Sequence, residues 1–194
     1  VICVRRNLSR FSGVPYGTAT PRSVSQYRTP HSPFCVTSVI YDIRMKEQPL
    51  AQEIVIFDID GTLADISQRV HHLRSKPKNW NAFNAGMAKD KAIHSMVRLC
   101  NILYASGLHV ILCSGRNEKY RTETIGWLKK EGVNYHELLL RKDNDMRQDV
   151  VVKREMLNDL DKSAILFVVE DRSRVVEMWR AEGLTCLQCA PGEY

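Results

Sequence analysis

Two aspartates, one residue apart, are the feature of this sequence best suited to chemistry. Asp58 and Asp60 follow the apolar run of "IVIFDIDGTLAD" (residues 54–65), and Gly61 comes next. Mutual repulsion and lost hydration both disfavour two carboxylates at the end of a buried strand. An isolated Asp-Gly-Thr is more often an ordinary turn, but this one follows an apolar run typical of a buried strand, so the stretch predicts a functional site. Gly61 permits a tight turn beside a ligand.

Further polar side chains stand where other apolar stretches end. Ser114 and Arg116 close the second such stretch, Glu170 and Asp171 close the fourth, and Lys153 precedes the fourth. Ligands of an open α/β sheet bind at the carboxyl ends of its parallel strands. We therefore expect these groups to converge on one edge of a sheet.

Such a cluster favours phosphate chemistry supported by a metal ion. Several carboxylates in one cleft raise one another's pKa unless a cation is present, and Mg²⁺ prefers oxygen ligands. Mg²⁺ and Lys153 together would offset the charge of an incoming phosphate. Asp58 is then the candidate nucleophile, and Asp60 is the candidate acid and base.

The elements that must position these groups alternate along the chain. Continuous apolar runs predict strands covered on both faces, and the segments between them carry apolar residues at helical spacing. This alternation predicts an α/β fold, with a Rossmann-like parallel sheet flanked by helices. The expected strands are 53–58, 108–115, 136–141, 163–171 and 184–190, and the expected helices are 91–107, 117–132, 149–160 and 173–183.

Charge is unevenly distributed along the 194 residues, whose net charge is +6. Residues 1–44 hold six arginines and a single acid, so the remaining 150 residues are almost neutral. The overall basicity is therefore no argument for a polyanionic partner of the domain. No apolar run approaches the roughly 20 residues of a membrane span, so no membrane association is expected.

Residues 1–44 are rich in Arg, Ser, Thr and Pro and show no sustained apolar period. Two interpretations stay open, an organelle transit segment and a disordered extension, and we favour the extension. "MKEQPLAQE" at 45–53 resembles a natural start. We expect one domain over residues 45–194, in a cytoplasmic protein.

Four elements of the sequence, "DIDGTL", "ILCSGR", Lys153 and "VVEDR", resemble in order the motifs of the haloacid dehalogenase superfamily of phosphohydrolases. Two longer segments narrow the resemblance, "RQDVVVKREML" (147–157) and "EDRSRVVEMWRAEGLTCLQCAPGEY" (170–194). They are similar to the 3′-phosphatase domain of phage polynucleotide kinase/phosphatase. Generic phosphatase chemistry requires neither the "RVVEMWR" helix nor the "PGEY" end, so these two features point specifically to the polynucleotide 3′-phosphatase branch.

The resemblance implies a role for each matching residue. Asp58 would form an aspartyl-phosphate and would also be a metal ligand. Asp60 would protonate the leaving oxygen, activate water and offer its backbone carbonyl to Mg²⁺. Ser114 would bind the phosphate and Lys153 would stabilise the phospho-aspartate. Asp171 and Glu170, an aspartate in the phage domain, are implied as metal ligands, and Arg69, Arg116 and Asp149 as substrate-binding residues.

Members of the superfamily insert a cap that covers the active site, and residues 64–90, approximately, occupy the position of this insert. "RVHHLRSKPK" (69–78) holds four Arg or Lys and no acid, which predicts a small helical cap open to a polymer end. A solvated basic loop is the alternative. Trp80 and Phe83 are expected to anchor the cap, and stacking on a terminal base is the less favoured role.

The implied activity is Mg²⁺-dependent removal of 3′-phosphates from DNA or RNA ends. The sequence contains no G-x-x-x-x-G-K-[ST] phosphate loop, so the phosphatase is expected to act alone or with a separately encoded kinase or ligase. Two alternatives stay open, the same chemistry on a mononucleotide and a non-catalytic module that binds phosphorylated ends. Asp58 and Asp60 argue against the second, because binding alone needs neither a nucleophile nor an acid.

Overall fold

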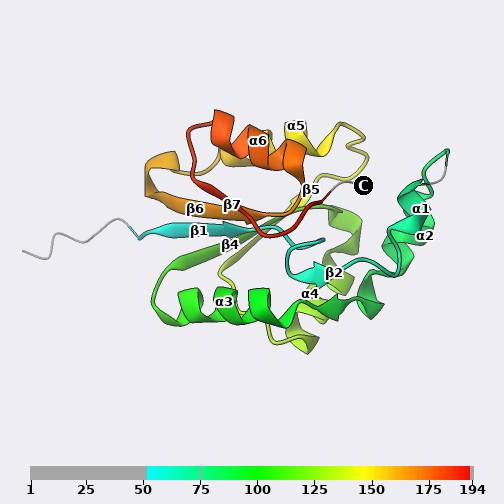
Figure 1. The fold of residues 1–194 in the computed structure, drawn as a ribbon, viewed down its shortest axis with the longest axis horizontal. Helices are drawn as coiled ribbons and strands as arrows, with labels where there is room; N and C mark the ends of the chain where they lie inside the picture. Colours follow the sequence, from blue (N-terminus) through cyan, green and yellow to red (C-terminus); the bar gives the residue numbers. More distant parts are fainter. Residues whose placement is uncertain (1–51, 75, 193–194) are drawn as a thin grey trace, which may run out of the picture. The chain divides into compact units, whose positions relative to one another are not determined.

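The computed structural model describes residues 52–74 and 76–192, so the expected extension 1–44 lies outside the described residues. A five-stranded sheet in the order β5-β4-β1-β6-β7 forms its centre (Figure 1). All of its strand pairs are parallel, as the strand–helix alternation predicts. The strands are β1 (Ile54–Phe57), β4 (His109–Asn117), β5 (Glu137–Arg141), β6 (Ile165–Glu170) and β7 (Cys186–Gln188).

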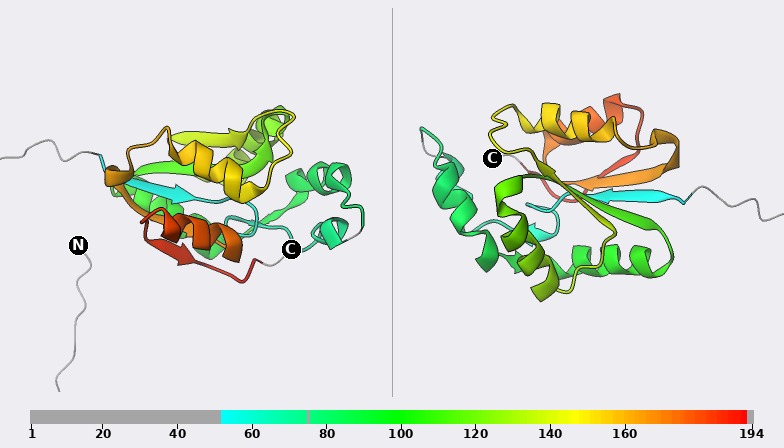
Figure 2. Two further views of the ribbon diagram at one scale, coloured as in Figure 1. Left: turned by 90° about the horizontal axis from the view of Figure 1, so that it is seen from above. Right: turned by 180° about the vertical axis from the view of Figure 1, so that it is seen from behind.

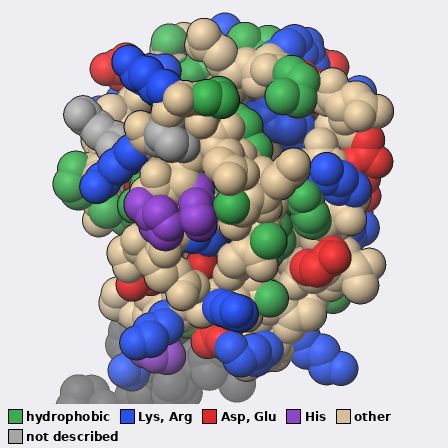
Figure 3. All heavy atoms as spheres, turned by 90° about the vertical axis from the view of Figure 1, so that its right-hand side faces the viewer, with side chains coloured by type: hydrophobic (Ala, Val, Ile, Leu, Met, Phe, Trp, Pro, Cys, Tyr) green, Lys and Arg blue, Asp and Glu red, His purple; other side chains and the backbone are tan. Residues whose placement is uncertain are grey.

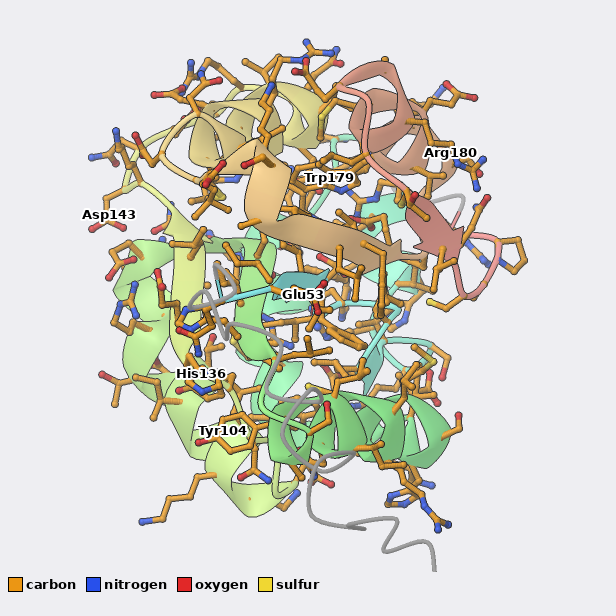
Figure 4. All side chains as sticks on the ribbon, turned by 90° about the vertical axis from the view of Figure 1, so that its left-hand side faces the viewer. Glu53, Tyr104, His136, Asp143, Trp179 and Arg180 are labelled. Atoms are coloured by element: carbon orange, nitrogen blue, oxygen red, sulfur yellow. The ribbon has the colours of Figure 1, made fainter. Side chains whose placement is uncertain are left out.

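Helices cover both faces of this sheet (Figures 1 and 2). Val55 and Phe57 pack with residues of α3 and α4 on one face, while Ile56 packs with residues of α5 and α6 on the other. Trp179 lies between α6 and the sheet (Figure 4). Burying each of these large side chains contributes about 1.5–3 kcal/mol. The helices are α3 (His94–Ala105), α4 (Arg121–Lys130), α5 (Asp149–Leu157) and α6 (Ser173–Ala181).

Between β1 and α3 lies the segment in which a cap is expected. A two-stranded antiparallel sheet of β2 (Ala64–Asp65) and β3 (Lys91–Ala92) closes its base. Inside it are α1 (His71–Arg74), α2 (Trp80–Ala85) and the 3₁₀ helix η2 (Met87–Lys89). A small apolar cluster of Ile66, Leu73 and Phe83 holds these short helices together.

Several element limits differ from those expected. β4 continues to Asn117, so Ser114 and Arg116 lie within the strand; its pairing with β5 shifts register between Ser114 and Asn117. The helix expected from residue 91 begins at His94, because Lys91 and Ala92 pair with β2. The 3₁₀ helix η3 (Glu118–Tyr120) lies where the helix 117–132 is expected to begin. A second 3₁₀ helix, η4 (Lys162–Ala164), overlaps the start of the expected strand 163–171.

Among the described residues, every helix is too short or too polar to cross a membrane.

Candidate active site

The ends of two neighbouring strands bring three carboxylates together. Asp58 follows β1, Glu170 closes β6, and Asp171 comes next. All three are buried, and each offers an oxygen within 4.8 Å of the others. The Asp58 amide donates to the Val169 carbonyl at 3.0 Å, which extends the strand pairing up to the cluster.

The Lys153 ammonium, from α5, lies among these carboxylates. It donates to Asp58 Oδ1 at 2.5 Å and to Glu170 Oε2 at 2.7 Å. Burial acts to lower the Lys153 pKa, but the carboxylates of Asp58 and Glu170 raise it well above its usual value. Glu170 Oε1 accepts from the backbone amides of Asp171 and Arg172 at 3.3 and 3.2 Å. The Glu170 side chain therefore also holds the loop after β6 in place.

The cluster holds an excess of negative charge. Burial and the neighbouring Glu170 raise the pKa of Asp58 to about 7, against the effect of Lys153. Burial and Asp58 raise the pKa of Asp171 to about 6. When ionised, three carboxylates and one ammonium leave two negative charges in excess. An oxygen-only set with this charge fits a hard divalent cation.

Two glycines bring backbone against Asp171. Gly61 has φ 93°, in the left-handed region that favours glycine. A Cβ on Gly61 or on Gly192 would overlap the Asp171 carboxylate. The turn after Asp60 therefore requires glycine for two reasons, its dihedral angle and its close approach to Asp171.

Asp60 lies outside this cluster of three carboxylates, and two arginines hold its side chain. Asp60 Oδ1 accepts from Arg69 Nη2 at 2.7 Å and from Arg116 Nη2 at 2.6 Å. Arg69 also donates to both oxygens of Asp90, at 2.9 Å from Nε and 2.6 Å from Nη2. Burial acts to raise the Asp60 pKa, but Arg116 and Arg69 lower it, so the carboxylate is ionised in this arrangement.

Asp149, the first residue of α5, connects three segments. Its Oδ1 accepts from Arg141 at 3.0 Å, and its Oδ2 accepts from Arg172 at 2.9 Å. Arg141 also donates from Nε to the Gly115 carbonyl at 3.0 Å. Asp149 thereby connects the end of β5 and the loop after β6 to α5, and Arg141 extends the connection to the backbone beside Ser114.

The predicted residues converge on a cavity of about 430 Å³. Arg69 and Lys153 lie behind its wall, each bound to a carboxylate that lines it. The predicted residues on the wall itself are Asp58, Asp60, Ser114, Arg116, Asp149, Glu170 and Asp171.

Three residues of this arrangement were not predicted from the sequence. Arg141 is the last residue of β5, so the strand-end rule that identified Asp58 also points to it. Arg172 follows the acids at the end of β6 and carries the same signal. Asp90 binds Arg69, which lies 21 residues earlier in the sequence, and no local sequence pattern around Asp90 predicts this contact.

The fold matches that of solved phosphatases. A class C acid phosphatase from Bacillus anthracis has a TM-score of 0.53 at 15% identity, covering 81% of this chain and 74% of that chain. A predicted phosphatase from Clostridium acetobutylicum has a TM-score of 0.54 at 14% identity, covering 71% and 84%. The expected α/β fold is confirmed, and it is that of the haloacid dehalogenase-like phosphatases.

Residues 52–194 match the polynucleotide kinase PNKP phosphatase domain, and the chain belongs to this family of phosphatases. Chains in two solved structures, of the Pnkp1/Rnl/Hen1 RNA repair complex and the Pnkp1/Rnl/Hen1 complex, are 30% and 31% identical to it. Both matches have a TM-score of 0.64 and cover 74% of this chain. They cover 44% and 47% of the other chains, so this chain spans less than half the length of either.

Proposed function

We propose that this phosphatase removes 3′-phosphates from nucleic-acid ends, with Mg²⁺ as cofactor and an aspartyl-phosphate on Asp58 as intermediate. One observation carries the proposal. The Asp58 carboxylate lines the cavity, with buried Lys153 at 2.5 Å and two further carboxylates beside it. Pure recognition of a phosphate needs cations rather than three acids, so this arrangement favours catalysis over a non-catalytic binding module.

The residues that would hold Mg²⁺ are Asp58, Asp171 and Glu170, with the backbone carbonyl of Asp60 as the further oxygen that the family resemblance implies. Their oxygen-only chemistry and excess negative charge support this choice. Bound Mg²⁺ supplies positive charge to the phosphoryl oxygens as the transition state forms.

Asp58 begins the reaction as the nucleophile. Its carboxylate oxygen bonds to phosphorus while the bond from phosphorus to the 3′-oxygen breaks. Lys153 holds Asp58 Oδ1, and Ser114 and Arg116 on the cavity wall bind phosphoryl oxygens. Asp60 gives its proton to the leaving 3′-oxygen, then takes one from the water that attacks the phospho-aspartate. Inorganic phosphate leaves, and Asp58 is regenerated.

Asp60 must hold a proton at the first of these steps. In the substrate-free arrangement, Arg69 and Arg116 favour its ionised form. A bound phosphate dianion competes for the Arg116 guanidinium and adds a like charge near Asp60. Both effects raise the Asp60 pKa toward the range that a general acid requires.

Unpaired cations around the cavity support a polymeric substrate. Lys78, Lys119 and Arg174 line it, and none forms an ion pair with another described residue. Figure 3 looks onto this side of the molecule and shows Lys and Arg side chains spread over it. A phosphodiester backbone leading away from the terminal phosphate would meet these cations. A volume of about 430 Å³ also admits a single nucleotide, which makes a nucleotide phosphatase the second candidate.

The similarity to chains of an RNA repair complex supports RNA ends among the substrates. A separately encoded kinase or ligase is the proposed partner, and the cytoplasm is the proposed location. We further propose that residues 45–194 form one domain, with the cap at about 64–90 and an extension at 1–44.

The test is phosphate release from one oligonucleotide carrying either a 3′- or a 5′-phosphate, with Mg²⁺ or with EDTA. We expect release from the 3′-phosphorylated strand only, in Mg²⁺ only, and none from the Asp58→Asn variant. Equal release from both ends would contradict the proposed substrate, and full activity in EDTA would contradict the proposed cofactor.

A further inference from the structure

We propose that Trp80 and Met146 form a stacking subsite for the terminal nucleobase of the 3′-phosphorylated strand. The inference rests on the proposed function and adds to it the part of the substrate that the protein contacts beyond the phosphate. The two side chains come from separate segments, α2 and the loop between β5 and α5, and both line the cavity. Figures 1 and 2 show these segments beyond the same edge of the sheet.

Trp80 differs from the other two tryptophans of the chain. Trp127 and Trp179 are 2% and 1% exposed, whereas Trp80 is 44% exposed. Phe83, only 4% exposed, lies in the apolar cluster of the cap, as expected of an anchor. Trp80 is also expected to anchor the cap, but it lies outside this cluster. The Phe83 ring meets Trp80 edge to face, with centroids 6.0 Å apart, and so supports the indole while leaving it accessible from the cavity.

Met146 is 85% exposed, the most exposed of the large apolar side chains described. Burial therefore does not explain its place on the cavity wall. Arg141 holds the loop on either side of it, donating from Nη1 to the carbonyls of Asp145 at 3.3 Å and Arg147 at 2.7 Å. These bonds hold the backbone on both sides of Met146, whose unbranched, polarisable side chain is left accessible, and a thioether packs well against aromatic rings.

A nucleobase matches this pair of side chains. Every base has a π-face that stacks on an indole regardless of sequence, as an enzyme acting on ends of any sequence requires. The Lys78 ammonium lies over one face of the Trp80 ring, 5.6 Å from its centre. A base that stacks on the indole would therefore have a cation close by for its sugar-phosphate backbone.

The kinetic test compares Trp80→Ala with wild type on a 3′-phosphorylated oligonucleotide that has either a normal or an abasic terminal nucleotide. We expect the variant to lose on the order of tenfold in kcat/KM on the normal end, almost nothing on the abasic end, and most of the loss to be restored in Trp80→Phe. Ile102→Ala, which removes an exposed apolar side chain outside the cavity, serves as matched control. Equal losses on both ends would overturn the subsite.

Binding gives an independent readout, because Trp80 is the only exposed tryptophan. In an Asp58→Asn background, a 3′-phosphorylated oligonucleotide should quench the exposed indole fluorescence, and the same strand with an abasic end should not. Met146→Ala should weaken binding of the normal end alone. Turnover of the oligonucleotide by wild type with no effect of either substitution would reject the subsite and leave the proposed function intact. No wild-type turnover of any 3′-phosphorylated strand would reject the proposed function itself.

Discussion

Asp58 and Asp60 are separated by one residue, yet their carboxylates have opposite surroundings. Burial and the neighbouring Glu170 raise the pKa of Asp58, while Arg116 and Arg69 lower that of Asp60. A nucleophile must be ionised and a general acid must be protonated, so each shift opposes the proposed role. A cation at the three carboxylates and a phosphate at the arginines would reverse both shifts. On this account, the site becomes competent only when both ligands are bound.

Replacing Asp60 separates the two halves of the proposed reaction. With p-nitrophenyl phosphate, whose leaving group needs no proton, Asp60→Asn should give a stoichiometric burst of p-nitrophenolate. Turnover should then be at least about a hundredfold slower than in wild type, because no base activates water. Rapid-quench kinetics measures the burst, and mass spectrometry should find the phosphoryl group on Asp58. A variant that slows the first turnover as much as later ones would argue against the intermediate.

The stability of the metal-free protein should depend on pH through the carboxylate cluster. Because the folded-state pKa values of Asp58 and Asp171 are raised to about 7 and about 6, folding favours their protonated forms. Their contribution to stability is full below the unfolded pKa of about 4 and is lost as the pH rises through the folded values. In EDTA, the Tm of wild type should therefore fall relative to that of Asp58→Asn between about pH 4 and about pH 7.

Mg²⁺ provides the control for this pH dependence. It should raise the wild-type Tm more at the higher pH, where the carboxylates are ionised, and should have less effect on Asp58→Asn. Parallel melting profiles of the two proteins in EDTA would show that the cluster does not titrate as described.

At the scale of the elements, the strand ends and the presence of a small helical cap could be predicted, but the internal packing of the cap could not. Apolar runs mark β1 and β6, and the rule that ligands bind at carboxyl ends of parallel strands then identifies Asp58 and Glu170. The cap helices α1 and α2 have four and six residues, too few for a helical period to be visible in the sequence. Their packing decides that Arg69 reaches Asp60 and Asp90. The register shift in β4 likewise arises from pairing with β5 and leaves no local signal.

The contact between Arg69 and Asp90 ties the cap to its base and should be costly to break. Their side chains are 3% and 0% exposed, and the loss of one partner leaves a buried charge without full compensation. Asp90→Asn should therefore lower the free energy of unfolding by about 3 kcal/mol in urea denaturation.

An exposed ion pair supplies the comparison. Glu182 binds Arg154 and Lys162 at the surface, where side-chain exposures are 23–47%. Glu182→Gln should change the free energy of unfolding by less than about 1 kcal/mol. If both substitutions had the same small effect, the cap would not depend on the Arg69–Asp90 contact.

At the scale of the whole molecule, charge is concentrated where the substrate would approach. The chain beyond residue 44 is nearly neutral, yet Lys78, Lys119 and Arg174 gather around one cavity without carboxylate partners among the described residues. If the proposed substrate is right, attraction of a nucleic acid depends on this local arrangement of cations and not on the net charge of the domain.

Salt tests this arrangement. The KM for a 3′-phosphorylated oligonucleotide should rise several-fold between about 50 and 200 mM salt, because cations that bind phosphates displace counterions. Lys78→Gln combined with Lys119→Gln should reduce that dependence. The KM for a 3′-mononucleotide should change much less, and equal salt dependence for the two substrates would reject contacts with the polymer.

The most direct measurement is the ratio of kcat/KM for a 3′-phosphorylated oligonucleotide to that for the free 3′-mononucleotide with the same terminal base, in Mg²⁺. A ratio of at least about tenfold is predicted, since the unpaired cations contact only the longer substrate. A ratio of one or below would contradict the account and identify a nucleotide phosphatase that carries the motifs of an end-processing enzyme.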